Sequence, residues 1–135
     1  MKNKKVSYPI VDLFAGPGGL GEGFSALDCK EFSTFHSIVS IEHDEFAHKT
    51  LLLRHFFRSF GQRKAPREYY EYISGEISKI VLIEKYPEQW KKAEASALRI
   101  SLGLRNHDFV KQIIDRRGCG KNLGLLGGSL YVFIR

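Results

Sequence analysis

Three glycines and one carboxylate have the residue types and spacing of a nucleotide-binding site. Gly16, Gly18 and Gly21 match the pattern Gly-x-Gly-x-x-Gly, which exposes bare backbone N–H groups to a ligand at the positive end of a helix. Glu42 follows at about the 20-residue offset of a carboxylate that accepts hydrogen bonds from ribose hydroxyls. Such a carboxylate can accept both hydroxyl protons, so we expect these residues to bind an adenosine group.

The first glycine turn needs a strand before it and a helix after it. Residues 9–14 are a short apolar segment, Pro-Ile-Val-Asp-Leu-Phe, that runs directly into the turn at 15–19 and predicts a buried strand. Leu20, Phe24 and Leu27 then recur at helical spacing, although two glycines weaken that helix. A strand, a glycine turn and a helix together predict a site at the carboxyl edge of a parallel sheet.

A second strand is predicted over 37–41 and ends at Glu42, and Asp44 is a suitable N-cap for a following helix. Apolar residues at alternating steps of four and three predict one buried stripe on this helix, formed by Phe46, Thr50, Leu53, Phe57 and Phe60. We interpret His48 and His55 as part of a solvated basic face. They stand seven residues apart, roughly 10 Å along a helix, which is too far for one metal ion.

Residues 61–121 are predicted to be a helical insertion that begins with a loop at 61–67. Its helix faces are two apolar series separated by Pro87: Tyr69, Ile73, Ile77 and Ile80, then Trp90, Ala93, Ala97, Ile100 and Leu104. Asn106 can cap a last helix, and 122–128 predict a third strand that enters another glycine turn.

The order strand, helix, strand, several helices, strand predicts an α/β fold with parallel strands, a partial Rossmann-like fold. Three strands are fewer than a doubly wound sheet normally has. We therefore expect an incomplete sheet, with apolar surface uncovered where later strands would pair.

The glycine pattern alone fits nicotinamide dinucleotides, flavin dinucleotides and S-adenosylmethionine equally well, because all three present an adenosine ribose. The full string from Val11 to Leu20, Val-Asp-Leu-Phe-Ala-Gly-Pro-Gly-Gly-Leu, is more specific and closely resembles the first motif of DNA (cytosine-5) methyltransferases. The resemblance implies an S-adenosylmethionine-dependent methyltransferase fold in which Phe14 packs against the cofactor. It also implies that Glu42 binds the ribose hydroxyls and that His43 lies near the adenine. The residues that would wrap the methionine portion are Ala15, Gly16, Pro17, Gly18, Gly19 and Leu20.

A second segment resembles the same family. Residues 122–128, Asn-Leu-Gly-Leu-Leu-Gly-Gly, are similar to the strand that leads into the family's Pro-Pro-Cys-Gln catalytic loop, but 129–135 contain neither proline nor cysteine. Cys29 and Cys119 precede the third strand and cannot take the place of that nucleophile. We therefore expect no catalytic residue in this chain and interpret it as a truncated, frameshifted or split reading frame.

This interpretation treats 1–135 as a single partial catalytic domain. It divides the domain into a cofactor half-site at 1–60, the helical insertion at 61–121, and a strand with an aborted catalytic loop at 122–135.

Charge and hydropathy limit the partners. The net charge is +6, with 21 Lys and Arg against 15 Asp and Glu, which is compatible with binding of double-stranded DNA and equally with an ordinary basic protein. No run of about 18 apolar residues occurs. We expect a cytoplasmic protein with neither a membrane span nor a metal.

Three functions remain open. The first is a DNA (cytosine-5) methyltransferase fragment that binds S-adenosylmethionine. The second is a non-catalytic binding module, or half of a split methyltransferase, whose open sheet edge recruits a complementary C-terminal half. The third is a dinucleotide-binding oxidoreductase domain, which Pro17 and the Asp12-x-Phe14 lead fit poorly.

Overall fold

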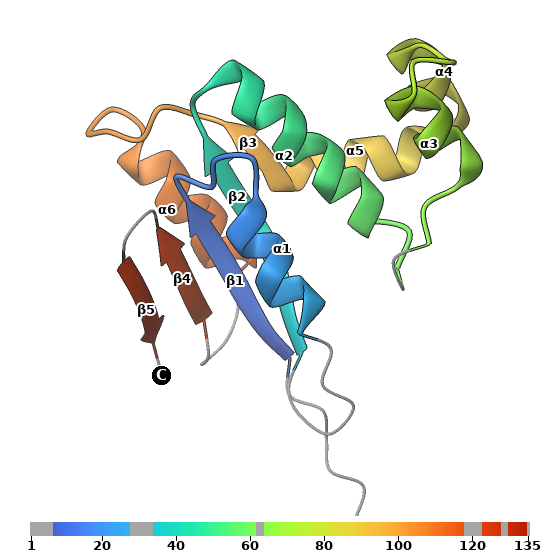
Figure 1. Cartoon of the computed structure of the whole chain (residues 1–135). Coiled ribbons are helices and arrows are strands. Elements are labelled where there is room, and N and C mark those ends of the chain that lie inside the picture. Colours follow the sequence, from blue (N-terminus) through green and yellow to red (C-terminus); the bar gives the residue numbers. More distant parts are fainter. Residues whose placement is uncertain (1–6, 28–33, 62–63, 118–122, 128–129, 135) are drawn as a thin grey trace, which may run out of the picture.

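The protein is an α/β structure built on an open sheet (Figure 1). The computed structural model describes residues 7–27, 34–61, 64–117, 123–127 and 130–134. The elements in chain order are β1 (Ser7–Leu13), α1 (Gly19–Ala26), β2 (Thr34–Glu42), α2 (Glu45–Arg58), α3 (Arg67–Ile73), α4 (Lys79–Lys85), α5 (Pro87–Ser96), β3 (Ala97–Arg99), α6 (His107–Arg117), β4 (Leu123–Gly127) and β5 (Leu130–Ile134). Within these ranges no helix is long and apolar enough to span a membrane.

The described strands form one sheet in the order β3-β2-β1-β4-β5. β1 is parallel to β2 and β4, β2 is parallel to β3, and β5 is antiparallel to β4. Leu13 pairs with Ile41, and Glu42 pairs with Arg99, so the carboxyl ends of β1, β2 and β3 lie at one edge. This arrangement confirms the predicted α/β, partial Rossmann-like fold with a sheet that does not close.

The two faces of β2 have different partners because side chains alternate along a strand. Val39 and Ile41 belong to a core cluster with Val11 and with Val110 of α6. Ser40, between them, contacts His55 of α2 on the other face. The larger core cluster lies on this second face and includes Leu51, Leu52, Phe56, Leu82, Trp90 and Ala93. Each large side chain fully buried there contributes about 1.5 to 3 kcal/mol.

The predicted buried stripe of α2 is wrong in phase. Phe46 is 77% exposed, and the buried residues of the helix are Leu51, Leu52, His55 and Phe56. Leu53 and Phe60 are only partly buried against the core. The segment is apolar on two overlapping faces, and packing against β2 and α5 selects one of them. His55 is therefore 6% exposed, so its assignment to a solvated face is also wrong.

Two expected helices end earlier than the apolar spacing predicts. The helix expected to run from Tyr69 to Ile80 is divided into α3 and α4, with Gly75 at φ 81° between them. Pro87 separates the two helical series, as predicted, and is itself the first residue of α5, which ends at Ser96. The next three residues form β3, and Leu104, which was expected on a helix face, is 99% exposed. The backbone groups of β3 form hydrogen bonds to β2, and this pairing outweighs the helical spacing of the apolar residues that continues across the segment.

The end of the chain differs from expectation in one respect. β4 lies within the predicted third strand, and α6 begins directly after Asn106, as predicted. Residues 130–134, which we expected in a loop, form β5 instead. β5 pairs with the edge of β4 that we expected to be open, so the outer strands are β3 and β5.

Candidate functional site at the carboxyl edge of the sheet

The turn after β1 holds an aromatic side chain out from the sheet. Phe14 has a positive φ of 57°, which is uncommon for a residue with a Cβ and is favoured mainly where surrounding structure requires it. Its side chain is 61% exposed. The next residue, Ala15, is buried and donates its N–H to the carbonyl of Ile41 at 2.9 Å. That hydrogen bond fixes the start of the turn against the end of β2.

Glycine is required at position 18 by both conformation and space. Gly18 has φ 86°, and a Cβ added there would lie 2.8 Å from Cδ1 of Leu51. It is also the N-cap of α1, and no described side chain caps that helix. The first N–H groups of α1 are thus left to other partners, at the end of the helix where the dipole favours negative charge. Pro17 and Gly19 lie exposed beside it, and Leu20 is 37% exposed.

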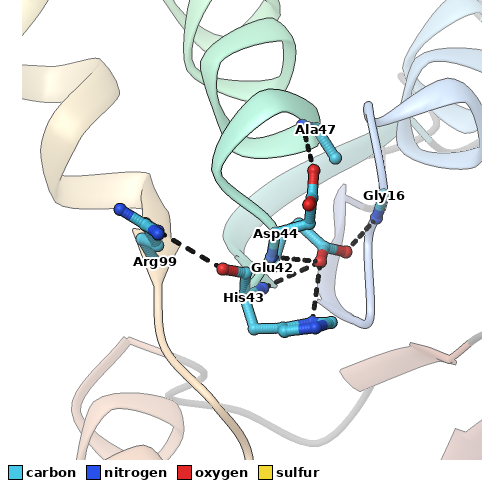
Figure 2. Close-up of polar contacts among 6 residues, drawn as sticks. All are labelled: Gly16, Glu42, His43, Asp44, Ala47 and Arg99. Carbon is cyan, nitrogen blue, oxygen red and sulfur yellow. Dashed lines mark hydrogen bonds and ion pairs between the residues drawn. The ribbon is translucent and has the colours of Figure 1, made fainter.

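The carboxylate of Glu42 joins the turn after β1 to the turn after β2 (Figure 2). Its Oε2 accepts a hydrogen bond from the N–H of Gly16 at 2.7 Å. Its Oε1 accepts from the N–H groups of His43 and Asp44, each at 2.8 Å. Burial raises the pKa of this carboxyl, but the three N–H donors together with His43 lower it more, so the net pKa is below the ordinary value. Glu42 is therefore an ionised hydrogen-bond acceptor at neutral pH.

The turn after β2 is fixed from two sides (Figure 2). Asp44 caps α2, as predicted, by accepting from the N–H of Ala47 at 2.8 Å. Arg99, at the end of β3, donates from Nε to the carbonyl of His43 at 3.3 Å. Sequence reasoning missed Arg99 because it placed this segment in a helix, and a three-residue strand leaves almost no period-2 pattern to detect.

A buried carboxyl lies beneath the first turn. Asp12 is 2% exposed, and its Oδ2 has no hydrogen-bond partner among the described residues. Burial raises its pKa to about 6, with a further increase from Glu42 and an opposing decrease from Arg58. A Cβ on Gly21 would come within 3.3 Å of Oδ2, so a small residue at that position permits the approach of α1 to this carboxyl.

The structure brings together the two halves of the predicted site. Gly16 contacts Glu42 directly, and the ring Nδ1 of His43 lies 3.1 Å from Oε1 of the same carboxylate. The His43 side chain is 68% exposed. The arrangement offers backbone N–H groups, an ionised acceptor and an exposed aromatic ring at one edge. Over the described ranges, no cluster of His, Cys, Asp and Glu could hold a metal.

The fold and this edge define the class of the protein: an α/β protein with a Rossmann-like, mainly parallel sheet and a glycine turn facing a carboxylate. Its sequence is similar to that of the type II methyltransferase M.Bpa9945I of Bacillus paralicheniformis, with 28% identity over 106 residues. The match covers 73% of this chain and 22% of that relative, so the chain spans less than a quarter of the relative's length. No family model matches the chain. No solved structure matches it either.

Proposed function

We propose that this chain binds S-adenosylmethionine at the carboxyl edge of its sheet, as the cofactor-binding part of a DNA (cytosine-5) methyltransferase. One observation carries the proposal: the N–H of Gly16 and the carboxylate of Glu42, 26 residues apart in the sequence, meet at 2.7 Å. The contact places the glycine turn beside an ionised acceptor, as an adenosine ligand requires. The similarity to a protein named as a type II methyltransferase supports the same class of reaction.

The other predicted site residues have matching roles in this proposal. Phe14 lies in the turn after β1, and His43 directly follows Glu42 in the turn after β2. Both side chains are exposed and offer rings to the adenine. Residues 15–20 follow the turn to the N-terminus of α1, where N–H groups without a capping side chain in the described chain can bind the carboxylate of the methionine portion.

The proposal assigns cofactor binding to this chain and methyl transfer to a larger assembly. In the resembling family a cysteine thiolate adds to C6 of a flipped cytosine, C5 takes the methyl group from the sulfonium, and loss of the C5 proton then eliminates the thiolate from C6. Ser129 follows Gly128 where the family motif has its Pro-Cys loop. We therefore propose that the thiolate and the contacts to double-stranded DNA come from a complementary C-terminal half. The division into half-site, insertion and terminal strand stays a prediction.

Calorimetric titration with S-adenosylhomocysteine, the demethylated cofactor, tests the proposal. We expect saturable binding at one site by the wild-type protein. Glu42→Gln should weaken binding at least about tenfold, because a hydrogen bond to a charged group contributes about 1.5 to 3 kcal/mol. Glu88→Gln is the matched control: Glu88 is exposed on the first turn of α5, at the opposite end of that helix from β3, so its change should leave affinity unchanged.

A second titration, with reduced nicotinamide dinucleotide, tests the alternative function that the glycine pattern leaves open, a dinucleotide-binding oxidoreductase domain. Fluorescence of the nicotinamide reports its binding directly. A folded protein that binds this dinucleotide and gives no heat with S-adenosylhomocysteine would contradict the proposal and favour an oxidoreductase domain.

A further inference from the structure

The helix that follows the glycine turn, α1, has few features of its own that stabilise it. Gly21 and Gly23 lie within it, and glycine is the least favourable residue in a helix interior after proline. Its N-terminus has no side-chain cap, and of its eight residues Gly21 alone is buried. α1 therefore depends on contacts with neighbouring elements to stay formed.

Arg58, the last residue of α2, makes two polar contacts with α1. Its Nε lies 3.2 Å from Oε2 of Glu22 in an ion pair, and its Nη1 donates a hydrogen bond to Oγ of Ser25 at 3.1 Å. Glu22 and Ser25 are three residues apart and so lie on one face of α1. The planar guanidinium can make both contacts at once. Because the Arg58 side chain is only 19% exposed, water screens these contacts weakly.

Arg58 also lies close to the buried carboxyl of Asp12. A Cβ on Gly21 would come within 3.3 Å of Oδ2 of Asp12 and 3.9 Å of Nη1 of Arg58, so both groups approach α1 at the same glycine. Burial raises the pKa of Asp12, and the positive charge of Arg58 opposes that increase. Arg58 therefore interacts with α1 and with the end of β1 from its position on α2.

The part of α1 that Arg58 contacts is joined directly to the glycine turn. The N–H of Glu22 donates to the carbonyl of Gly18 at 3.0 Å, so the first turn of α1 starts within the turn itself. If the side chains of Glu22 and Ser25 lost Arg58, this first turn would open more often. The N–H groups at the start of α1 would then no longer be held in one direction.

We infer that Arg58 is a positioning residue for the ligand site: from α2 it holds α1, and with it the glycine turn, in the conformation that binds the ligand. The inference rests on the proposed binding of S-adenosylmethionine and adds to it a residue that does not touch the ligand. Affinity then falls in proportion to the fraction of molecules in which the start of α1 is formed.

Calorimetry with S-adenosylhomocysteine on wild type, Arg58→Met and Arg58→Lys tests the inference. We expect Arg58→Met to bind at least about fivefold more weakly than wild type. Arg58→Lys should have an intermediate affinity, because an ammonium keeps the charge but lacks the fork that reaches both partners. Arg67→Met is the matched control: Arg67 is 86% exposed on α3, which lies apart from α1 (Figure 1), so its change should leave affinity unchanged.

A second variant keeps Arg58 and removes its partners on α1. Glu22→Gln combined with Ser25→Ala should weaken binding about as much as Arg58→Met, and all three changes together should weaken it no further. Circular dichroism checks that each variant is folded. Amide hydrogen exchange of the free proteins gives a readout without ligand: exchange should be faster than in wild type at the amides of residues 22–26 and unchanged in α5.

The outcomes separate this inference from the proposed function. Wild-type affinity in Arg58→Met, or in the folded variant that lacks Glu22 and Ser25, would overturn the inference and leave the proposed function standing. Weaker binding with equally faster exchange in α1 and α5 would also overturn it, because Arg58 would then stabilise the whole fold and not the turn. Absence of binding by folded wild-type protein would overturn both.

Discussion

His55 lies buried between β2 and α5, and acidification should destabilise the protein through this side chain. It is 6% exposed, with Nδ1 2.8 Å from Oγ of Ser96 and Nε2 3.0 Å from Oγ of Ser40. The Ser96 hydroxyl donates to the carbonyls of Lys92 and Ala93, so it must accept from Nδ1–H of His55. Nε2 is then the acceptor, and the ring is neutral.

The size of the effect follows from the pKa of His55. Burial, with smaller contributions from Arg58 and His48, lowers this pKa from 6.5 to about 3. Below pH 6.5 the unfolded chain therefore binds a proton that the folded protein does not, and stability falls by about 1.4 kcal/mol per pH unit. Between pH 6.5 and 5 the loss through His55 is about 2 kcal/mol.

A second buried group acts in the opposite direction and must be separated from the first. Burial raises the pKa of Asp12 from 3.8 to about 6, so as the pH falls from 6 to 3.8 the folded protein binds a proton that the unfolded chain does not. Stability gained at Asp12 offsets stability lost at His55 in this window. In the wild-type protein the contributions of these two groups therefore largely cancel in this window.

Urea unfolding of wild type and His55→Gln at pH 7 and pH 5 isolates the histidine. At pH 7 the variant should be less stable by about 1 to 3 kcal/mol, because it loses part of the hydrogen bonding to Ser40 and Ser96. At pH 5 the difference should shift by about 2 kcal/mol in favour of the variant, which has no imidazole to protonate. A stability difference that stays the same at both pH values would refute the reasoning.

Three further perturbations follow from the site. Gly18→Ala should lower the free energy of unfolding by about 1 to 3 kcal/mol in urea titrations. The backbone at this position has φ 86°, and the alanine Cβ would lie 2.8 Å from Cδ1 of Leu51. Unchanged stability would contradict the expected strain. Arg99→Ala should weaken S-adenosylhomocysteine binding about threefold to tenfold in calorimetry, because the turn at His43 loses its hydrogen bond from Arg99, and Arg99→Lys should have an intermediate affinity. Equal affinity of wild type and both variants would show that the turn does not need the Arg99 side chain. The stability of Asp12→Asn relative to wild type should rise by about 2.5 kcal/mol from pH 4 to pH 7, because wild type must ionise a buried carboxyl over this range and the variant has none to ionise. A pH-independent difference in denaturant midpoints would exclude this.

Sequence reasoning predicted the turn and the carboxylate because their signals are local. The apolar run before Ala15 ends at glycines that permit positive φ, and Glu42 ends the next apolar segment, so element type and edge position follow from neighbouring residues alone. The contact between Gly16 and Glu42 then follows from parallel pairing, which places both strand ends at one edge.

The features that sequence reasoning missed depend on tertiary partners. The phase of α2 is set by packing against β2 and α5, so the burial of His55 and the exposure of Phe46 were not visible in the spacing. β3 is three residues long, and a helical pattern continues across it from α5. Arg99 was missed for that reason, although it supports the turn beside the candidate site.

Backbone amide chemical shifts during titration with S-adenosylhomocysteine test the central claim most directly. The account predicts that the largest saturable shifts occur at the amides of Gly16, His43 and Asp44, whose N–H groups all bind the Glu42 carboxylate. The amide of Gly75, between α3 and α4, should not shift. Saturable binding that leaves the three amides unchanged and shifts others would contradict the account.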